Sequence, residues 1–198
     1  MKRLLAIAVA SAFAGVAFAN APVGQPAPAF TVTDLAGKPV NLADYKGKTV
    51  VLEWHNFGCP FVQKHYKSGN MQALQKKYGA DVVWLAVNST NKSASDWMEP
   101  GPLTAELKRF GATPAHYLVD EPGKVGVAYG AKTTPHMYII DPQGKVVYNG
   151  AIDDKRSTNP EDVKTSKNYV AAALDELKAG KPVTVASTAP YGCTIKYR

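Results

Sequence analysis

The chain has 198 residues, a formal net charge of +7 at pH 7 and only two cysteines. This length suits a single domain with a sizeable hydrophobic core. The basic residues are scattered, without a run of four or more, so we expect them to be solvated and expect no nucleic-acid partner. Two cysteines are too few for a disulfide scaffold, which leaves a single staple or a single reactive pair.

The beginning of the chain has the pattern of a bacterial-type export signal. The basic pair Lys2 and Arg3 precedes an apolar run at 4–16, and the small-x-small signature Ala-Phe-Ala follows. The run is short for a membrane span, although an uncleaved signal anchor is the alternative. We therefore expect residues 1–19 to be a signal peptide cleaved near Ala19. The mature protein would be periplasmic or secreted, without stable membrane insertion.

The first predicted elements after the signal are a β-hairpin and a buried strand. Strands at 29–34 and 39–42 flank a turn around Gly37. The segment 49–55, TVVLEWH, is a nearly continuous run of β-branched and aromatic residues, which is typical of a central strand. We expect the hairpin to be an N-terminal extension of the domain.

A helix and a second buried strand follow. Pro60 stands near the first helical position, where its missing N–H costs no hydrogen bond. Gly69 and Asn70 weaken the middle of this helix, and Gly79 ends it. The apolar run at 81–87 predicts the second strand, so the strand–helix–strand unit is a right-handed parallel crossover.

The rest of the chain predicts an α/β fold. Residues 88–102 are polar, which predicts an exposed loop with a short helix near Trp97. The further predicted elements are a helix at 104–110, strands at 116–119, 137–140 and 145–148, and a helix at 166–178. This order indicates a central mixed β-sheet flanked by helices, followed by a C-terminal tail at 181–198.

Cys59 is the strongest candidate for a reactive group. It stands after a buried strand and at the first turn of a helix, where unsatisfied N–H groups and the helix dipole stabilise a thiolate. Pro60 stiffens the turn behind it. The alternative is an inert buried cysteine.

The segment VVLEWHNFGCPFV at 50–62 resembles the thioredoxin active site, with Cys59 at the first position of the CxxC motif. Thr134-Pro135 before the strand MYII is similar to the superfamily's cis-proline, which implies that it faces Cys59 and helps to bind an extended substrate. The likeness covers roughly residues 22–180. It implies a thioredoxin-like domain at 20–180 of the redoxin branch, which includes exported thiol–disulfide oxidoreductases and the alkyl-hydroperoxide-reductase/thiol-specific-antioxidant (peroxiredoxin) group.

The departures from these motifs are as informative as the matches. Val62 occupies the second CxxC position, so no disulfide can form across the helix turn. A peroxidatic signature would place cysteine, threonine and proline where Val62, Cys59 and His55 stand. The chain is similar to peroxiredoxin-like proteins that keep only the first cysteine.

Cys193 is the only other thiol available to resolve an intermediate at Cys59. The extended chain from Leu177 to Cys193 spans up to about 50 Å, against a domain radius of gyration of about 16 Å. The surrounding residues 190–195, PYGCTI, have the turn and aromatic residues of a docked segment. A structural staple and an unpaired thiol are the alternatives.

Three more residues are candidates for supporting roles. Glu53 matches the position of a buried carboxylate in thioredoxins and could accept the proton of Cys59, unless it is a strand-end residue paired with a surface lysine. His55 shares its strand face and could pair with the thiolate, or it is a hydrogen-bonded structural residue. Trp97 could face a substrate or partner. The histidines lack metal-ligand spacing, so we expect no metal.

The sequence therefore predicts an exported thiol–disulfide oxidoreductase, or thiol-based antioxidant protein, without a cofactor. Cys59 attacks a protein or small-molecule disulfide or a peroxide, Cys193 resolves the product, and an external reductant or oxidant restores the pair. One alternative is a redox-inactive binding module with a structural Cys59–Cys193 disulfide. Another is an atypical thiol peroxidase.

Overall fold

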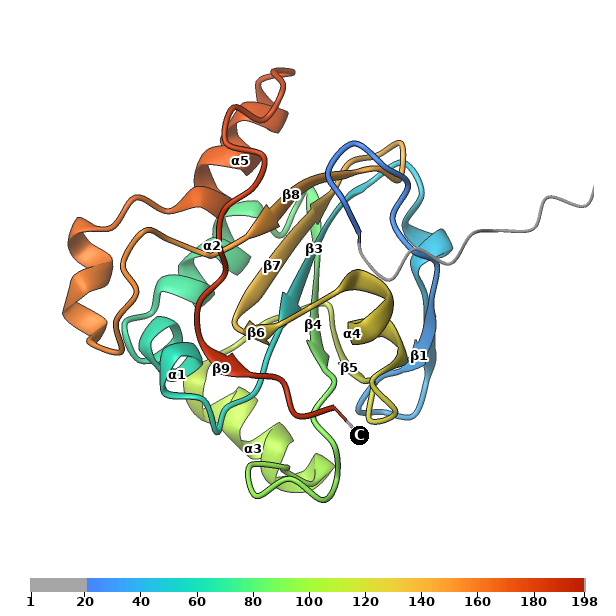
Figure 1. Cartoon of the computed structure of the whole chain (residues 1–198), viewed down its shortest axis with the longest axis vertical. Helices are drawn as coiled ribbons and strands as arrows, with labels where there is room; N and C mark the ends of the chain where they lie inside the picture. The colour runs from blue at the N-terminus through green and yellow to red at the C-terminus, as the bar shows by residue number, and fades with distance from the viewer. Residues whose placement is uncertain (1–20, 198) are drawn as a thin grey trace, which may run out of the picture.

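The computed structural model describes residues 21–197 and is built on a five-stranded mixed sheet (Figure 1). The strands are ordered β5-β4-β3-β7-β8. In that order they span His116–Val119, Val82–Asn88, Thr49–Trp54, His136–Ile140 and Val146–Gly150. β3, β4 and β5 are parallel, whereas β7 runs antiparallel to β3 and β8. The predicted mixed sheet is confirmed; the predicted signal peptide lies outside the described residues.

Helices cover both faces of the sheet. The α-helices are α1 (Pro60–Lys67), α2 (Asn70–Tyr78), α3 (Pro100–Phe110), α4 (Lys124–Tyr129) and α5 (Tyr169–Lys178), and the 3-10 helices are η1 (Leu42–Tyr45) and η2 (Pro160–Thr165). One apolar cluster joins the sheet to α1, α2, α3 and α5, and the other joins it to α4 and the N-terminal hairpin. In Figure 1, α1, α2 and α5 lie on one side of the sheet and α4 and β1 on the other.

The central strand β3 supplies side chains to both clusters. Val50, Leu52 and Trp54 belong to the cluster under α4, and Val51 belongs to the cluster under α1 and α2. Because successive side chains of a strand point to opposite faces, Glu53 also lies on the α1 face. The continuous apolar run of the sequence is explained by this burial on both sides.

The N-terminal hairpin is confirmed, and one predicted helix is divided. β1 (Thr31–Thr33) pairs antiparallel with β2 (Pro39–Asn41). Gly69, with φ of 73°, separates α1 from α2 at the position where the sequence weakens the helix.

Two features of the 88–102 loop differ from prediction. α3 begins at Pro100, earlier than expected, because proline is favourable in the first helical turn. The predicted short helix near Trp97 is wrong: those residues form turns, closed by hydrogen bonds such as that from the Trp97 amide to the Ala94 carbonyl.

The C-terminal tail forms a strand that the sequence does not indicate. β9 (Cys193–Thr194) pairs antiparallel with β6 (Thr133–Thr134), just before Pro135. Figure 1 follows the tail from α5 across the molecule to this strand pair. The tail therefore brings Cys193 to the end of α1 that carries Cys59.

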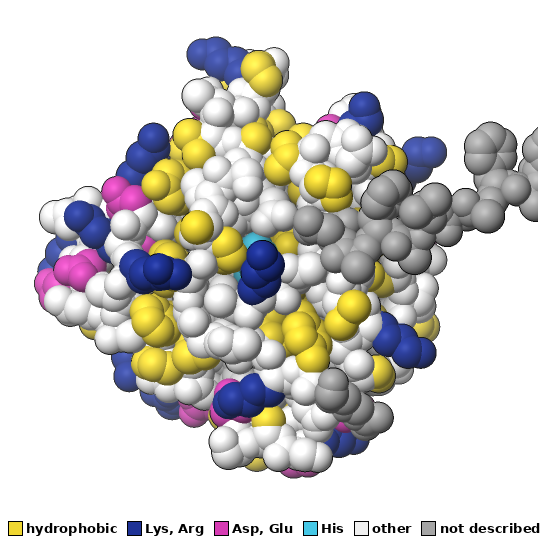
Figure 2. Space-filling model, in the orientation of Figure 1, with side chains coloured by type: hydrophobic (Ala, Val, Ile, Leu, Met, Phe, Trp, Pro, Cys, Tyr) yellow, Lys and Arg dark blue, Asp and Glu magenta, His cyan; other side chains and the backbone are white. Residues whose placement is uncertain are grey.

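The surface on the tail side is mixed in character. Figure 2 shows lysine and arginine side chains dispersed among apolar and acidic ones on this face, rather than gathered into one patch. None of the helices between residues 21 and 197 has the length and apolar character needed to cross a membrane.

Candidate active site

Cys59 is the N-cap residue of α1, and the turn before it is fixed by Asn56. The Asn56 carbonyl accepts a hydrogen bond from the Cys59 amide at 3.0 Å, and its side-chain oxygen accepts one from the Gly58 amide at 2.7 Å. Pro60 stands in the first turn of the helix, as predicted. The thiol thus lies at the N-terminal end of α1.

The Cys59 thiol is fully buried and faces the Thr134-Pro135 peptide. Its Sγ donates to the Thr134 carbonyl at 3.0 Å. The Thr134–Pro135 bond is cis, so this prediction is confirmed. The burial agrees with one part of the alternative interpretation of Cys59, and the tail residues Tyr191 and Cys193 pack in the same apolar cluster.

Cys193 lies beside the same carbonyl group. In the β6–β9 pair it is directly opposite Thr134, and both cysteines are unpaired thiols. Burial, a hydrogen bond with Cys59 and the charge of Cys59 together raise the pKa of Cys193 to about 12. The structure therefore brings together Cys59, Cys193, Thr134 and Pro135.

The tail packs tightly against this site at Gly192. Its φ of 144° is a backbone conformation that suits glycine. A Cβ at this position would overlap the Thr134 carbonyl group and press on the Pro135 nitrogen. Because Gly192 has no side chain, the backbone of the tail can pack directly against the cis peptide.

Glu53 is buried and hydrogen-bonded within the domain. Its carboxylate accepts from Tyr66 Oη at 3.0 Å and from Trp84 Nε1 at 2.8 Å. Burial, opposed by these hydrogen bonds, raises the pKa of Glu53 to about 7. The alternative of a strand-end residue paired with a surface lysine is therefore wrong. That Glu53 accepts the proton of Cys59 stays a prediction.

His55 has the environment of a structural residue. Its Nδ1 is hydrogen-bonded to Tyr117 Oη at 2.9 Å, and its buried Nε2 has no hydrogen-bond partner among the described residues. Burial lowers the pKa of His55 to about 3, so the ring is neutral. Neither ring nitrogen of His55 is hydrogen-bonded to Cys59, so the predicted pairing with the Cys59 thiolate has no support in this geometry.

Trp97 is half-buried in the loop that the tail also touches. Its Nε1 donates to Glu99 Oε1 at 3.0 Å. The tail holds this loop through an ion pair of 2.6 Å between Lys196 and Asp96 and through the Asn91 amide, which donates to the Lys196 carbonyl at 2.9 Å. Contact between Trp97 and a substrate stays a prediction.

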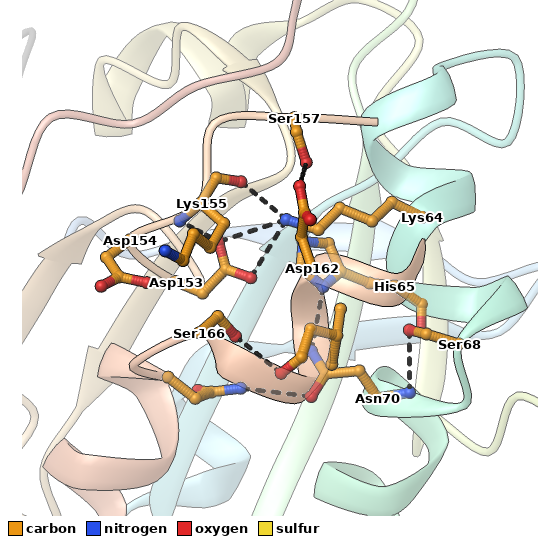
Figure 3. Close-up of polar contacts among 12 residues, drawn as sticks. Lys64, His65, Ser68, Asn70, Asp153, Asp154, Lys155, Ser157, Asp162 and Ser166 are labelled. Atoms are coloured by element: carbon orange, nitrogen blue, oxygen red, sulfur yellow. Dashed lines mark hydrogen bonds and ion pairs between the residues drawn. The ribbon is translucent and has the colours of Figure 1, made fainter. Parts of the chain in front are cut away.

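One buried cluster near the site is absent from the sequence predictions. Lys64 of α1 was expected on the solvated surface with the other lysines, but it is fully buried and paired with Asp153 at 3.2 Å (Figure 3). The sequence carries no local signal for this burial, because Lys64 is two positions from both Val62 and Tyr66 and so does not share their face of the helix. The residues that pair with Lys64 lie far along the chain.

Comparisons with known proteins show the family of the chain. The AhpC/TSA family pattern matches residues 23–149. The thiol–disulfide oxidoreductase ResA of Bacillus thuringiensis subsp. konkukian is 28% identical over 126 residues, which cover 63% of this chain and 67% of that protein.

Solved structures extend the similarity to nearly the whole described chain. An uncharacterized conserved protein from Geobacillus kaustophilus is 31% identical with a TM-score of 0.78, covering 90% of this chain and 93% of that one. A DsbE-type putative thiol:disulfide interchange protein from Chlorobium tepidum is 27% identical with a TM-score of 0.53, covering 65% and 84%. The fold, the relatives and a cysteine facing a cis-proline support the class of thiol–disulfide oxidoreductases. The chain belongs to the AhpC/TSA family, in the redoxin branch of the thioredoxin superfamily.

Proposed function

We propose that this protein is an exported thiol–disulfide oxidoreductase that cycles Cys59 and Cys193 between the dithiol and the disulfide. The observation that carries the proposal is the position of both residues beside the Thr134 carbonyl: Cys59 donates to it, and Cys193 is its strand partner. Val62 leaves no nearer thiol along α1, so the tail supplies the second one.

The reaction has two exchange steps that balance. The Cys59 thiolate attacks one sulfur of a substrate disulfide, forms a mixed disulfide and releases the first substrate thiolate. The Cys193 thiolate then attacks the Cys59 sulfur, forms the Cys59–Cys193 disulfide and releases the second substrate thiolate. The substrate gains two electrons and the protein loses two, so an external dithiol must restore the protein. With an external oxidant the cycle runs in reverse.

The electrostatics of Cys193 suit the order of these steps. Part of the rise in the Cys193 pKa comes from its hydrogen bond to Cys59 and from the charge of Cys59. Once Cys59 is in a mixed disulfide, that charge is gone and the thiolate of Cys193 becomes easier to form. The first step would thus remove part of the penalty on the Cys193 thiolate, while burial, the largest cause of its raised pKa, remains.

Four further residues are assigned roles in substrate binding and proton transfer. We assign Thr134, Pro135 and Trp97 to substrate contact. The Thr134 carbonyl accepts from the Cys59 thiol, and the tail that pairs with β6 is also held to the 88–102 loop by the Lys196–Asp96 ion pair. Glu53, with a pKa of about 7, is the proposed proton acceptor on the α1 face of the sheet. The export proposal rests on the signal pattern of residues 1–19.

Peptide mapping without reduction tests the pairing. Protein oxidised by a small excess of glutathione disulfide should contain one intramolecular disulfide, between the Cys59 and Cys193 peptides. Cys193→Ser should instead accumulate Cys59 as a mixed disulfide with glutathione, because no second thiol completes the exchange. In Cys59→Ser, Cys193 should form a mixed disulfide with glutathione much more slowly than Cys59 does in Cys193→Ser. Equal behaviour of wild type and Cys193→Ser would contradict the two-cysteine cycle.

A further inference from the structure

A buried ion pair lies beneath the tail, next to the site. Lys64 of α1 and Asp153, which follows β8, are fully buried, with Nζ and Oδ2 3.2 Å apart. Lys64 Nζ also donates to the Lys155 carbonyl at 2.6 Å, as the close-up of this region shows (Figure 3). A buried ion pair is costly unless its remaining hydrogen-bonding capacity is filled.

Tyr191 of the tail fills that capacity. Its hydroxyl donates to Asp153 Oδ1 and accepts from Lys64 Nζ at 3.3 Å. The three N–H donors of Lys64 thus find a carboxylate, a carbonyl and a phenol oxygen. We call the three residues Lys64, Asp153 and Tyr191 the tail anchor.

The α1 helix supplies the surroundings of the Tyr191 side chain. The Tyr191 ring meets the Phe61 ring edge-on at 5.8 Å, and the side chain is buried. His65 Nε2 is 3.3 Å from the Tyr191 hydroxyl, and His65 Nδ1 is 2.9 Å from Asn70 Nδ2. Burial lowers the pKa of His65 to about 4, so a neutral ring meets the hydroxyl at neutral pH.

The anchor and the thiol share one short segment of chain. Only Gly192 separates Tyr191 from Cys193, and Gly192 lies on the Thr134 carbonyl. Tyr191 is held against Lys64 and His65 of α1, and Gly192 packs on the cis peptide. Cys193 therefore has little freedom to move away from Cys59. Release of Tyr191 would remove one hydrogen-bond partner from each member of the buried ion pair, which disfavours the open tail.

We propose that Lys64, Asp153 and Tyr191 are positioning residues that hold the tail closed and set the effective concentration of the Cys193 thiol at Cys59. This proposal rests on the two-cysteine cycle proposed above. When the anchor is weakened, the reduced tail spends more time open, so the intramolecular disulfide forms less readily and is reduced more readily.

The test compares Tyr191→Phe with Tyr78→Phe in the full chain. Tyr78 is the control because its side chain is also buried and its hydroxyl also donates to a carboxylate, Asp175 Oδ1 at 2.8 Å, but at the α2–α5 contact and with a half-exposed acceptor. Each protein is equilibrated in glutathione redox buffers, and free thiols are counted by alkylation and mass. We expect Tyr191→Phe to lower the equilibrium constant for the disulfide about tenfold, as loss of a hydrogen bond to a charged group implies. Tyr78→Phe should match the wild type.

A second measurement reports how often the tail opens and does not depend on redox chemistry. In a Cys59→Ser/Cys193→Ser background, hydrogen exchange of the 193–195 amides should be about tenfold faster with Tyr191→Phe than without it. Asp153→Asn should have a similar effect, and the double variant should add little, because the two residues act through one contact. If Tyr191→Phe changed neither the hydrogen-exchange rates of these amides nor the equilibrium constant for the disulfide, the proposed role of the tail anchor would be wrong. Absence of any intramolecular disulfide in the wild type would contradict the two-cysteine cycle instead, while the exchange measurement would still decide the anchor.

Discussion

Gly192 of the C-terminal tail packs on the carbonyl group of Thr134 so closely that no Cβ fits between them. The same carbonyl accepts the hydrogen bond of the Cys59 thiol. Cys59 and the tail thus meet at one carbonyl group, and Cys59 has no exposed surface in this conformation.

Gly192→Ala should open the tail. Overpacking of this kind costs about 1–3 kcal/mol, which corresponds to an increase of about tenfold or more in the open fraction. In a Cys193→Ser background, alkylation of Cys59 by iodoacetamide should accelerate by the same factor. Gly101→Ala is the control, because a Cβ there meets open space. Equal alkylation rates in the two variants would mean that the tail does not limit access to Cys59.

Glu53 makes a specific contribution to the pH dependence of stability. Burial raises its pKa from 4.5 to about 7, so between these values the folded protein keeps a proton that the unfolded chain has released. Stability should therefore fall as the pH rises through this window, by about 3 kcal/mol in total, and level off above it.

Urea unfolding of wild type and Glu53→Gln at pH 5 and pH 8 isolates this effect. The variant lacks the ionisation, so its stability relative to the wild type should improve by about 2.5 kcal/mol between the two pH values. Contributions from the buried histidines cancel, because both proteins contain them. A stability difference that is the same at pH 5 and pH 8 would show that Glu53 titrates normally.

His55→Phe distinguishes the two interpretations of His55. The aromatic neighbours Phe57, Tyr66 and Tyr117 contact the ring edge-on, so phenylalanine fits, but Tyr117 loses its hydrogen-bond partner. We expect a loss of about 1–3 kcal/mol in stability, with an unchanged rate of thiol exchange per folded molecule. Tyr117→Phe breaks the same bond and is the control. A large loss of exchange rate in His55→Phe alone would assign His55 to the thiolate.

The central part of the fold could be predicted because its signals are local. The apolar run of β3, the proline after Cys59 and the second apolar run of β4 each mark an element within a few residues. The Thr134-Pro135 pair was found through its resemblance to a known motif, and its cis bond agrees.

The tail contacts could not be predicted because they have no local pattern. Two-residue strands such as β6 and β9 are too short to show alternation, and short α4 contains Gly126 between valines, which is a poor helix signal. Lys64 resembles any surface lysine in the sequence, since Asp153 and Tyr191 are brought to it only by the tertiary fold. Reach along the chain allowed Cys193 to approach Cys59, but only the structure gives it a strand partner there.

The reduction potential of the Cys59–Cys193 pair is the most direct test of the proposed cycle. The protein is equilibrated with glutathione buffers, or with dithiothreitol buffers for more negative potentials, and the oxidised fraction is measured by alkylation and mass. A working exchange pair should have a potential between about −270 and −120 mV, the range of catalytic disulfides. A potential below about −300 mV, typical of structural disulfides, would make the bridge a staple and the protein a binding module. Failure to form the bridge at any potential would contradict a role for Cys193 altogether.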